Sequence, residues 1–160
     1  AINASLAGLL VFSTLHTNDA PGAVTRFIDI GLKPFLVASS TRCLMAQRLV
    51  RKICKRCGEP YQPEESELKS LNIDPSAAGA NFRRGKGCNE CSNGHRGRMG
   101  IFVIDDEARK LIYEKVPASA LRTRAREMGM RTLREDGARK VLAGLTTPEE
   151  VIRATVGDTD

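Results

Sequence analysis

The sequence predicts an α/β fold that carries a metal-binding insert and a helical C-terminal part. Three observations predict it: an unbroken apolar run near the N-terminus, two Cys-x2-Cys pairs in a loop-rich stretch, and helical patterns beyond them. With 160 residues, of which 41% are hydrophobic, the chain can form one domain with a small appendage. No apolar run approaches the roughly 20 residues of a membrane span, and no signal-peptide pattern is present, so we expect a cytoplasmic protein.

The first expected element is a strand over residues 8–15, Gly-Leu-Leu-Val-Phe-Ser-Thr-Leu. An apolar run without alternation is typical of a strand buried on both faces, as in a parallel sheet. Polar residues 16–19 follow it, at the place where such a strand would end. In open α/β sheets ligands bind beyond the carboxyl ends of the strands, so a binding site is expected here.

Two helices are expected next. Asn18 or Asp19 is a good N-cap for the first, and Gly31 is a plausible stop. The second is expected over about 34–53, with a proline in its first turn. Cys43 lies inside it, where a small buried residue is expected.

The amino-acid composition changes over residues 54–98, where glycine, proline, asparagine, serine and charged residues dominate. One short helix is expected there, over about 63–71. The stretch has little apolar material, so a metal crosslink would supply the missing stability. The sequence therefore divides into residues 1–53, an insert over 54–98, and a C-terminal part over 99–160.

The C-terminal part is expected to begin with a strand over 99–104 and to continue as helices. Their expected ranges are 106–114, 117–128 and 133–142. A last helix is expected to begin with a capping box formed by Thr147 and Glu150, with proline at its first position.

The strongest motif is C-x2-C-x30-C-x2-C, formed by Cys54, Cys57, Cys88 and Cys91. Four soft sulfur ligands favour zinc or an iron–sulfur centre. A complete shell of four thiolates leaves no open position, so we expect a structural zinc ion.

Other uses of these cysteines are less compatible with the pattern. A redox Cys-x-x-Cys needs one activated pair on a thioredoxin-like scaffold, and disulfides are disfavoured in a reducing cytoplasm. His95, four residues after the last cysteine, is an alternative ligand, although a loop or packing role suits it better.

Nucleotide-binding motifs are incomplete. The nearest match to a P-loop, Gly79–Gly87, has one residue too many between its glycines and lacks the serine or threonine that binds magnesium. No Walker B strand is present, so the chain by itself should not hydrolyse ATP. His16 could donate to a phosphate oxygen, or it could bond a backbone carbonyl while its neighbours cap a helix.

Several segments, in order along nearly the whole chain, resemble the secretion ATPases of type II secretion and type IV pilus assembly. They are Ser13–Ala20, Ile30–Ser40, Ala46–Arg51, the four cysteines, Gly97–Ile101, Gly129–Gly137 and Lys140–Thr147. The resemblance implies the C-terminal part of a RecA-like P-loop NTPase core, with a small tetracysteine zinc module and a helical C-terminal bundle. It also implies a homohexamer beside an inner-membrane platform protein, at the cytoplasmic face of the bacterial inner membrane.

In that family the segment similar to Thr14–Asp19 is the His box, placed beside the γ-phosphate of ATP. The resemblance thus implies that His16 assists hydrolysis, with Thr14 and Thr17 nearby. The family's P-loop and Walker B would precede residue 1, so ATP and Mg²⁺ are expected only with the full-length parent. Short departures from the family pattern fall at 93–94 and 102–104.

Two other classes of function remain open from the sequence. A net charge of +6 and cations around the cysteines suit a zinc-ribbon nucleic-acid-binding module. The aromatic residues that such modules use are scarce here, so no nucleic acid is expected. A purely structural assembly domain is the third class.

Overall fold

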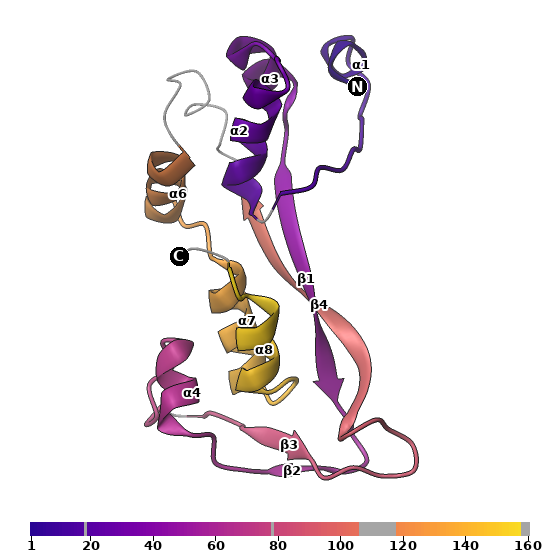
Figure 1. Ribbon diagram of the computed structural model, residues 1–160, viewed down its shortest axis with the longest axis vertical. Coiled ribbons are helices and arrows are strands. Elements are labelled where there is room, and N and C mark those ends of the chain that lie inside the picture. Colours follow the sequence, from indigo (N-terminus) through magenta and orange to yellow (C-terminus); the bar gives the residue numbers. More distant parts are fainter. Residues whose placement is uncertain (18, 78, 106–117, 158–160) are drawn as a thin grey trace. The chain divides into compact units, whose positions relative to one another are not determined.

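The computed structural model describes residues 1–17, 19–77, 79–105 and 118–157 (Figure 1). By its internal contacts the chain divides into two compact units. Unit 1 comprises Ala1–Ala46 with Val103–Arg131, and unit 2 comprises Gln47–Phe102 with Thr132–Asp160. In the described part of the chain, no helix has the length and apolar character that crossing a membrane requires.

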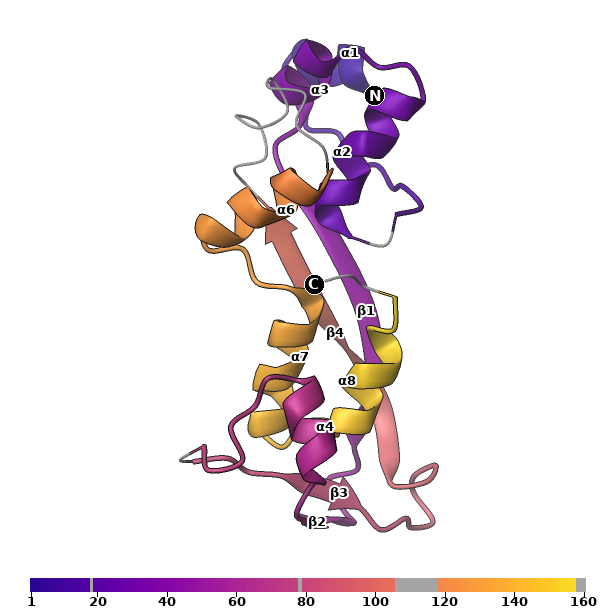
Figure 2. The same ribbon diagram turned by 60° about the vertical axis from the view of Figure 1, so that its left-hand side comes forward.

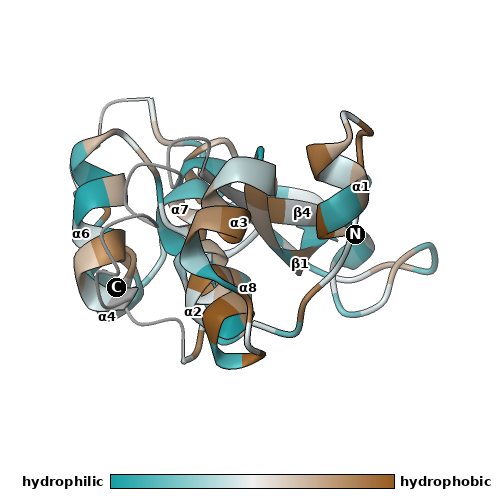
Figure 3. Cartoon of the chain, turned by 90° about the horizontal axis from the view of Figure 1, so that it is seen from above, coloured by the Kyte–Doolittle hydropathy of each residue, from teal (hydrophilic) through white to brown (hydrophobic). Residues whose placement is uncertain are grey.

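Unit 1 contains several helices. They are α1 (Ile2–Leu6), α2 (Ala20–Asp29), α3 (Pro34–Ser40) and α6 (Ala118–Glu127). Asp19 caps α2, because its Oδ1 accepts a hydrogen bond from the Gly22 N–H at 2.9 Å. Helix α2 packs against both α3 and α6. Much of α3 is hydrophobic (Figure 3), and its Val37 and Ala38 are buried.

The expected strand over 8–15 is wrong. These residues form no helix or strand, and Phe12 is 87% exposed. A strand persists only where neighbouring strands satisfy its backbone N–H and C=O groups. The strands of the described residues pair β1 with β4 and β2 with β3, so this segment has no partner among them.

The expected helix over 34–53 is also wrong in its second half. Helix α3 ends at Ser40, and strand β1 (Leu44–Ile53) follows, with alternating burial at its start. Its helix-forming residues adopt a strand because they pair with β4 (His95–Asp105), which contains the strand expected at 99–104. Cys43 therefore precedes a strand, and it is exposed rather than buried.

Unit 2 combines short strands with helices. Strands β2 (Gly58–Pro60) and β3 (Arg83–Gly85) are antiparallel, and their register pairs Gly58 with Gly85. The helices are α4 (Glu65–Ser70), α7 (Leu133–Leu142) and α8 (Pro148–Ala154). Figures 1 and 2 show these three helices side by side, and α8 packs against both of the others.

The core of unit 2 is aliphatic. Its buried side chains include Val50, Leu68, Ile101, Val141 and Val151. Gly137 lets α7 approach α8 closely, because a Cβ there would lie only 2.3 Å from Val151 Cγ1. The insert and the helical tail therefore share one core.

The helices expected in the insert and in the C-terminal part are confirmed where they can be compared. Helices α4, α6 and α7 lie within one or two residues of the expected bounds, and α8 begins at the expected proline. The expected helix over 106–114 lies outside the described residues. The capping box at Thr147 is wrong: the Thr147 side chain makes no cap hydrogen bond, and the Glu150 carboxylate, which would reach back to the N-cap, binds Arg51 instead.

Candidate metal centre

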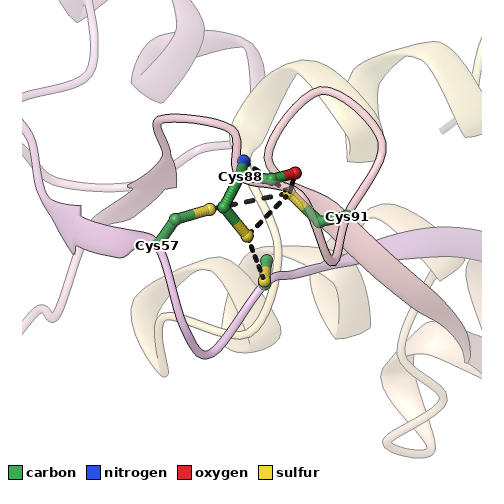
Figure 4. Close-up of side chains that lie close together, drawn as sticks. Cys57, Cys88 and Cys91 are labelled. Atoms are coloured by element: carbon green, nitrogen blue, oxygen red, sulfur yellow. Dashed lines mark hydrogen bonds between the residues drawn. The ribbon is translucent and has the colours of Figure 1, made fainter.

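The four cysteines lie at the ends of strands in unit 2. Cys54 follows β1, Cys57 precedes β2, Cys88 follows β3 and Cys91 precedes β4. The side chains of the three labelled cysteines point toward a common centre (Figure 4). The pairing of β2 with β3 brings the second and third cysteines together although 30 residues separate them in the sequence.

The distances between sulfurs fit a single tetrahedral ion. The Sγ atoms of Cys54 and Cys88 are 3.9 Å apart, and those of Cys57 and Cys91 are 3.7 Å apart. The Sγ atoms of Cys88 and Cys91 are 3.6 Å apart, and all four lie within 4.8 Å of one another. Four Zn–S bonds of about 2.3 Å in a tetrahedron place sulfurs about 3.8 Å apart. A disulfide would need about 2.05 Å, so the arrangement is one that could hold a metal ion.

Backbone hydrogen bonds fix the loops that carry the sulfurs. The Cys88 N–H donates to Cys91 Sγ at 3.2 Å, and the Cys54 N–H donates to Gly94 O at 2.8 Å. Gly85 and Gly94 touch through their backbones, since a Cβ on Gly85 would lie 2.1 Å from Gly94 O. The two cysteine loops are thus held together before any ligand is considered.

The thiols differ in acidity. Backbone N–H groups of Cys57 and Arg56 lower the pKa of the Cys54 thiol to about 7. Burial raises the pKa of Cys57 to about 11, and burial also raises the pKa of Cys88. One thiol therefore ionises readily, and a bound cation would draw off the other protons.

Cations surround the cluster and form part of a neighbouring pocket. Arg56 and Arg96 both pair with Glu90, the latter at 3.0 Å. The pocket has a volume of about 490 Å³ and is lined by Lys52, Ile53, Cys54, Lys55, Arg56, Glu90 and Arg96. Four thiolates with one divalent ion carry two negative charges, which these side chains can offset.

His95 does not belong to the cluster. The only His, Cys, Asp and Glu group of metal-binding size among the described residues consists of the four cysteines. The Nδ1 atom of His95 lies 2.9 Å from Asn93 O, and its backbone pairs with Ser92. The cysteines therefore offer a complete set of four ligands.

The residues expected to assist hydrolysis lie together in unit 1, just before α2. Thr14 and His16 are exposed. Thr17 is half-buried, and its Oγ1 donates to Asp19 O at 3.1 Å. Sequence analysis missed the partner of this segment, Arg122, which pairs with Asp19 from 103 residues away. No local signal could have found such a contact.

Comparisons with known proteins agree on one family. A family model described as "Type II/IV secretion system protein" matches residues 1–153. Type II secretion system protein E of Pseudomonas aeruginosa is 49% identical over 159 residues, which are 97% of this chain and 31% of that protein. The Type II secretion system ATPase E of Vibrio cholerae is 42% identical over 159 residues, with coverage of 97% and 31%.

A pilus protein matches over a similar range. The Type IV pilus assembly ATPase PilB of Thermus thermophilus is 40% identical over 161 residues, which are 98% of this chain and 18% of that protein. The chain thus spans less than a third of the length of these relatives. The family match includes both the cysteine cluster and the segment around His16. This chain belongs to the type II/IV secretion system protein family.

Proposed function

We propose that this chain acts as the C-terminal part of a hexameric ATPase that powers type II secretion or type IV pilus assembly. The observation that carries the proposal is the match over residues 1–153 to a family whose relatives are named as ATPases of these two systems. Residues 1–53 would complete a RecA-like core, 54–98 would form the zinc module, and 99–160 the helical tail. The P-loop and Walker B would lie in the rest of the parent protein.

The metal of this proposal is structural zinc, held by Cys54, Cys57, Cys88 and Cys91. The sulfur spacing supports one ion rather than two disulfides. A multi-iron cluster would need the same thiolates arranged around a larger body. Zinc here would crosslink two loops and perform no chemistry, because four thiolates leave no position for water or substrate.

His16 is proposed to assist ATP hydrolysis, with Thr14 and Thr17 beside it. An imidazole N–H can stabilise negative charge that develops on a phosphate oxygen during phosphoryl transfer. The exposure of His16 supports this role, since a residue that meets ATP must be accessible. ATP and Mg²⁺ would be held largely by the parent's other segments.

The proposed setting is the cytoplasmic face of the inner membrane, where the hexamer would contact the platform protein of the secretion or pilus machine. A nucleic-acid role is less well supported. Basic side chains around the cysteines pair with carboxylates, which leaves less charge for phosphates. The pairs are Arg56 and Arg96 with Glu90, Lys86 with Glu59, and Arg84 with Glu149.

The test is His16→Ala in a full-length ATPase that carries this segment. We expect ATP turnover to fall by about 100-fold or more while ATP binding changes little, as for loss of a group that acts in the transition state. His95→Ala is the matched control, because it removes the chain's other histidine. Equal turnover in the His16 variant and the parent would contradict the proposed role.

A further inference from the structure

We propose that Arg122 is a positioning residue for the segment that carries His16. Its ion pair with Asp19 fixes the beginning of α2 and, through the hydrogen bond from Thr17 to Asp19, the position of Thr17 beside His16. This inference rests on the function proposed above for His16.

Each oxygen of the Asp19 carboxylate has a different hydrogen-bond partner. Oδ2 of Asp19 lies 2.5 Å from Nε of Arg122, while Oδ1 accepts the cap hydrogen bond from Gly22. The two side chains are 23% and 32% exposed, so the pair is partly shielded from water. Such charge-assisted hydrogen bonds are shorter and stronger than neutral ones.

Further contacts hold Asp19 in this position. A Cβ at Gly22 would lie 2.3 Å from Asp19 Oδ1, so the glycine leaves room for the cap in its present position. Helix α6, which carries Arg122, packs along α2. Asp19 is thus fixed by its own helix and by a residue 103 positions away.

His16 depends on this arrangement because little else holds it. Its side chain is exposed and has no hydrogen-bond partner within residues 1–17, 19–77, 79–105 and 118–157. The neighbouring Thr17 is tied to the backbone of Asp19 through its hydroxyl group. The position of His16 is therefore set through its backbone, and Arg122 anchors the end of that backbone segment.

A purely structural ion pair would give a different experimental result. It would lower stability when removed and leave the chemical step unchanged at temperatures where the protein is folded. A positioning residue acts on the geometry of the reacting groups, so its loss lowers kcat more than it raises KM for ATP.

The experiment measures kcat and KM for ATP in a full-length ATPase carrying this segment. Arg122→Gln should lower kcat by about 10-fold to 100-fold with KM within about twofold. Asp19→Asn keeps an oxygen for the helix cap but loses the charge, so it should have the same effect. The double variant should be no worse than either single one, because both remove one interaction.

Two further variants separate positioning from folding. Arg122→Lys keeps a positive charge and should restore part of kcat. Arg124→Gln, on the same helix, breaks only an exposed pair with Glu127 and should leave kcat unchanged. If Arg122→Gln does not fold, Asp19→Asn still tests the proposal, because it removes the same charge pair: kcat equal to that of the parent would overturn it.

His16→Ala, measured in parallel, distinguishes two failures. Impaired His16→Ala with normal Arg122→Gln overturns only the positioning role. Normal turnover in both variants overturns the function proposed for His16 as well. Additive losses in the Asp19 and Arg122 variants would also overturn the positioning role, since they would show that the two residues act separately.

Discussion

The carboxylate of Glu150 accepts two hydrogen bonds from the side chain of Arg51, from Nη2 at 2.7 Å and from Nε at 3.0 Å. The backbone N–H of Arg51 donates to it as well, at 3.1 Å, and Arg153 pairs with it at 2.7 Å. The Glu150 side chain is only 2% exposed. A buried carboxylate therefore joins α8 to β1, three residues before the first cysteine of the cluster.

Glu150→Gln should destabilise unit 2. A neutral amide cannot balance Arg51 and Arg153, and it leaves their N–H groups with a poorer acceptor. We expect the free energy of unfolding to fall by about 2 kcal/mol, less than for a fully buried pair because Arg51 is partly exposed. Urea unfolding at neutral pH measures this, with Glu149→Gln as the exposed neighbouring control. Equal losses of unfolding free energy in the two variants would contradict the stabilising role of the Glu150–Arg51 pair.

The same pair predicts a pH dependence. Burial alone would raise the pKa of Glu150, but the hydrogen bonds and positive charge of Arg51, with Arg153, lower it below its ordinary 4.5. A lowered pKa in the folded state stabilises the protein fully above the unfolded pKa, and this stabilisation is lost as pH falls through the folded pKa. The stability difference between the parent chain and Glu150→Gln should therefore shrink below about pH 4.5. A difference that stays constant there would contradict the assignment.

Metal removal should loosen the helical tail as well as the insert. The Asn81 N–H donates to Leu142 O at 2.9 Å, and the Ile53 N–H donates to Leu145 O at 3.0 Å. These bonds connect the segment before β3 and the end of β1, both next to cysteines of the cluster, to the end of α7 and the turn that follows it. Hydrogen exchange of the 160-residue chain, with and without a zinc chelator, should show faster exchange in 81–95 and also in α8.

Helix α2 provides the internal reference for that experiment, because it belongs to unit 1. Its exchange should change little when the chelator is added. Unchanged exchange in α8, together with faster exchange in 81–95, would show that the insert unfolds independently of the tail.

Structural features that depend on residues close together in the sequence were predicted well. The bounds of α7 follow from its local apolar period, and the spacing of the cysteines anticipated their convergence on one centre. The helical period and each Cys-x2-Cys pair are signals contained in short stretches, although 30 residues separate the two pairs. The choice of ion has not been tested by the structure, and zinc stays a prediction.

Features that depend on distant partners were missed. The residues of β1 favour a helix locally, and their pairing with β4, about 50 positions later, decides otherwise. Residues 8–15 show the reverse case, because their strand-forming composition has no partner strand among the described residues. Glu150 was expected in a capping box, but its carboxylate binds Arg51, 99 positions away, instead.

Gly85→Ala should weaken the metal site through a steric clash. A Cβ would meet the Gly94 carbonyl oxygen at 2.1 Å, and backbone atoms cannot move aside cheaply. Gly97→Ala, in the neighbouring strand β4, is the control: nothing lies within 4 Å of the added Cβ, and only the φ of +77° makes alanine unfavourable, by about 1 kcal/mol. We expect Gly85→Ala to lose zinc to a competing chelator at a lower chelator concentration. Equal retention would show that the two loops can separate without harming the site.

The most direct test of the central claim is the metal content of the freshly purified chain. We expect one zinc per chain, with X-ray absorption showing four sulfur neighbours at about 2.3 Å. Cys88→Ser should lose most of this zinc, whereas Cys43→Ser, which alters an exposed cysteine outside the cluster, should retain it. A chain without zinc, or equal zinc content in both variants, would contradict a metal centre formed by the four cysteines.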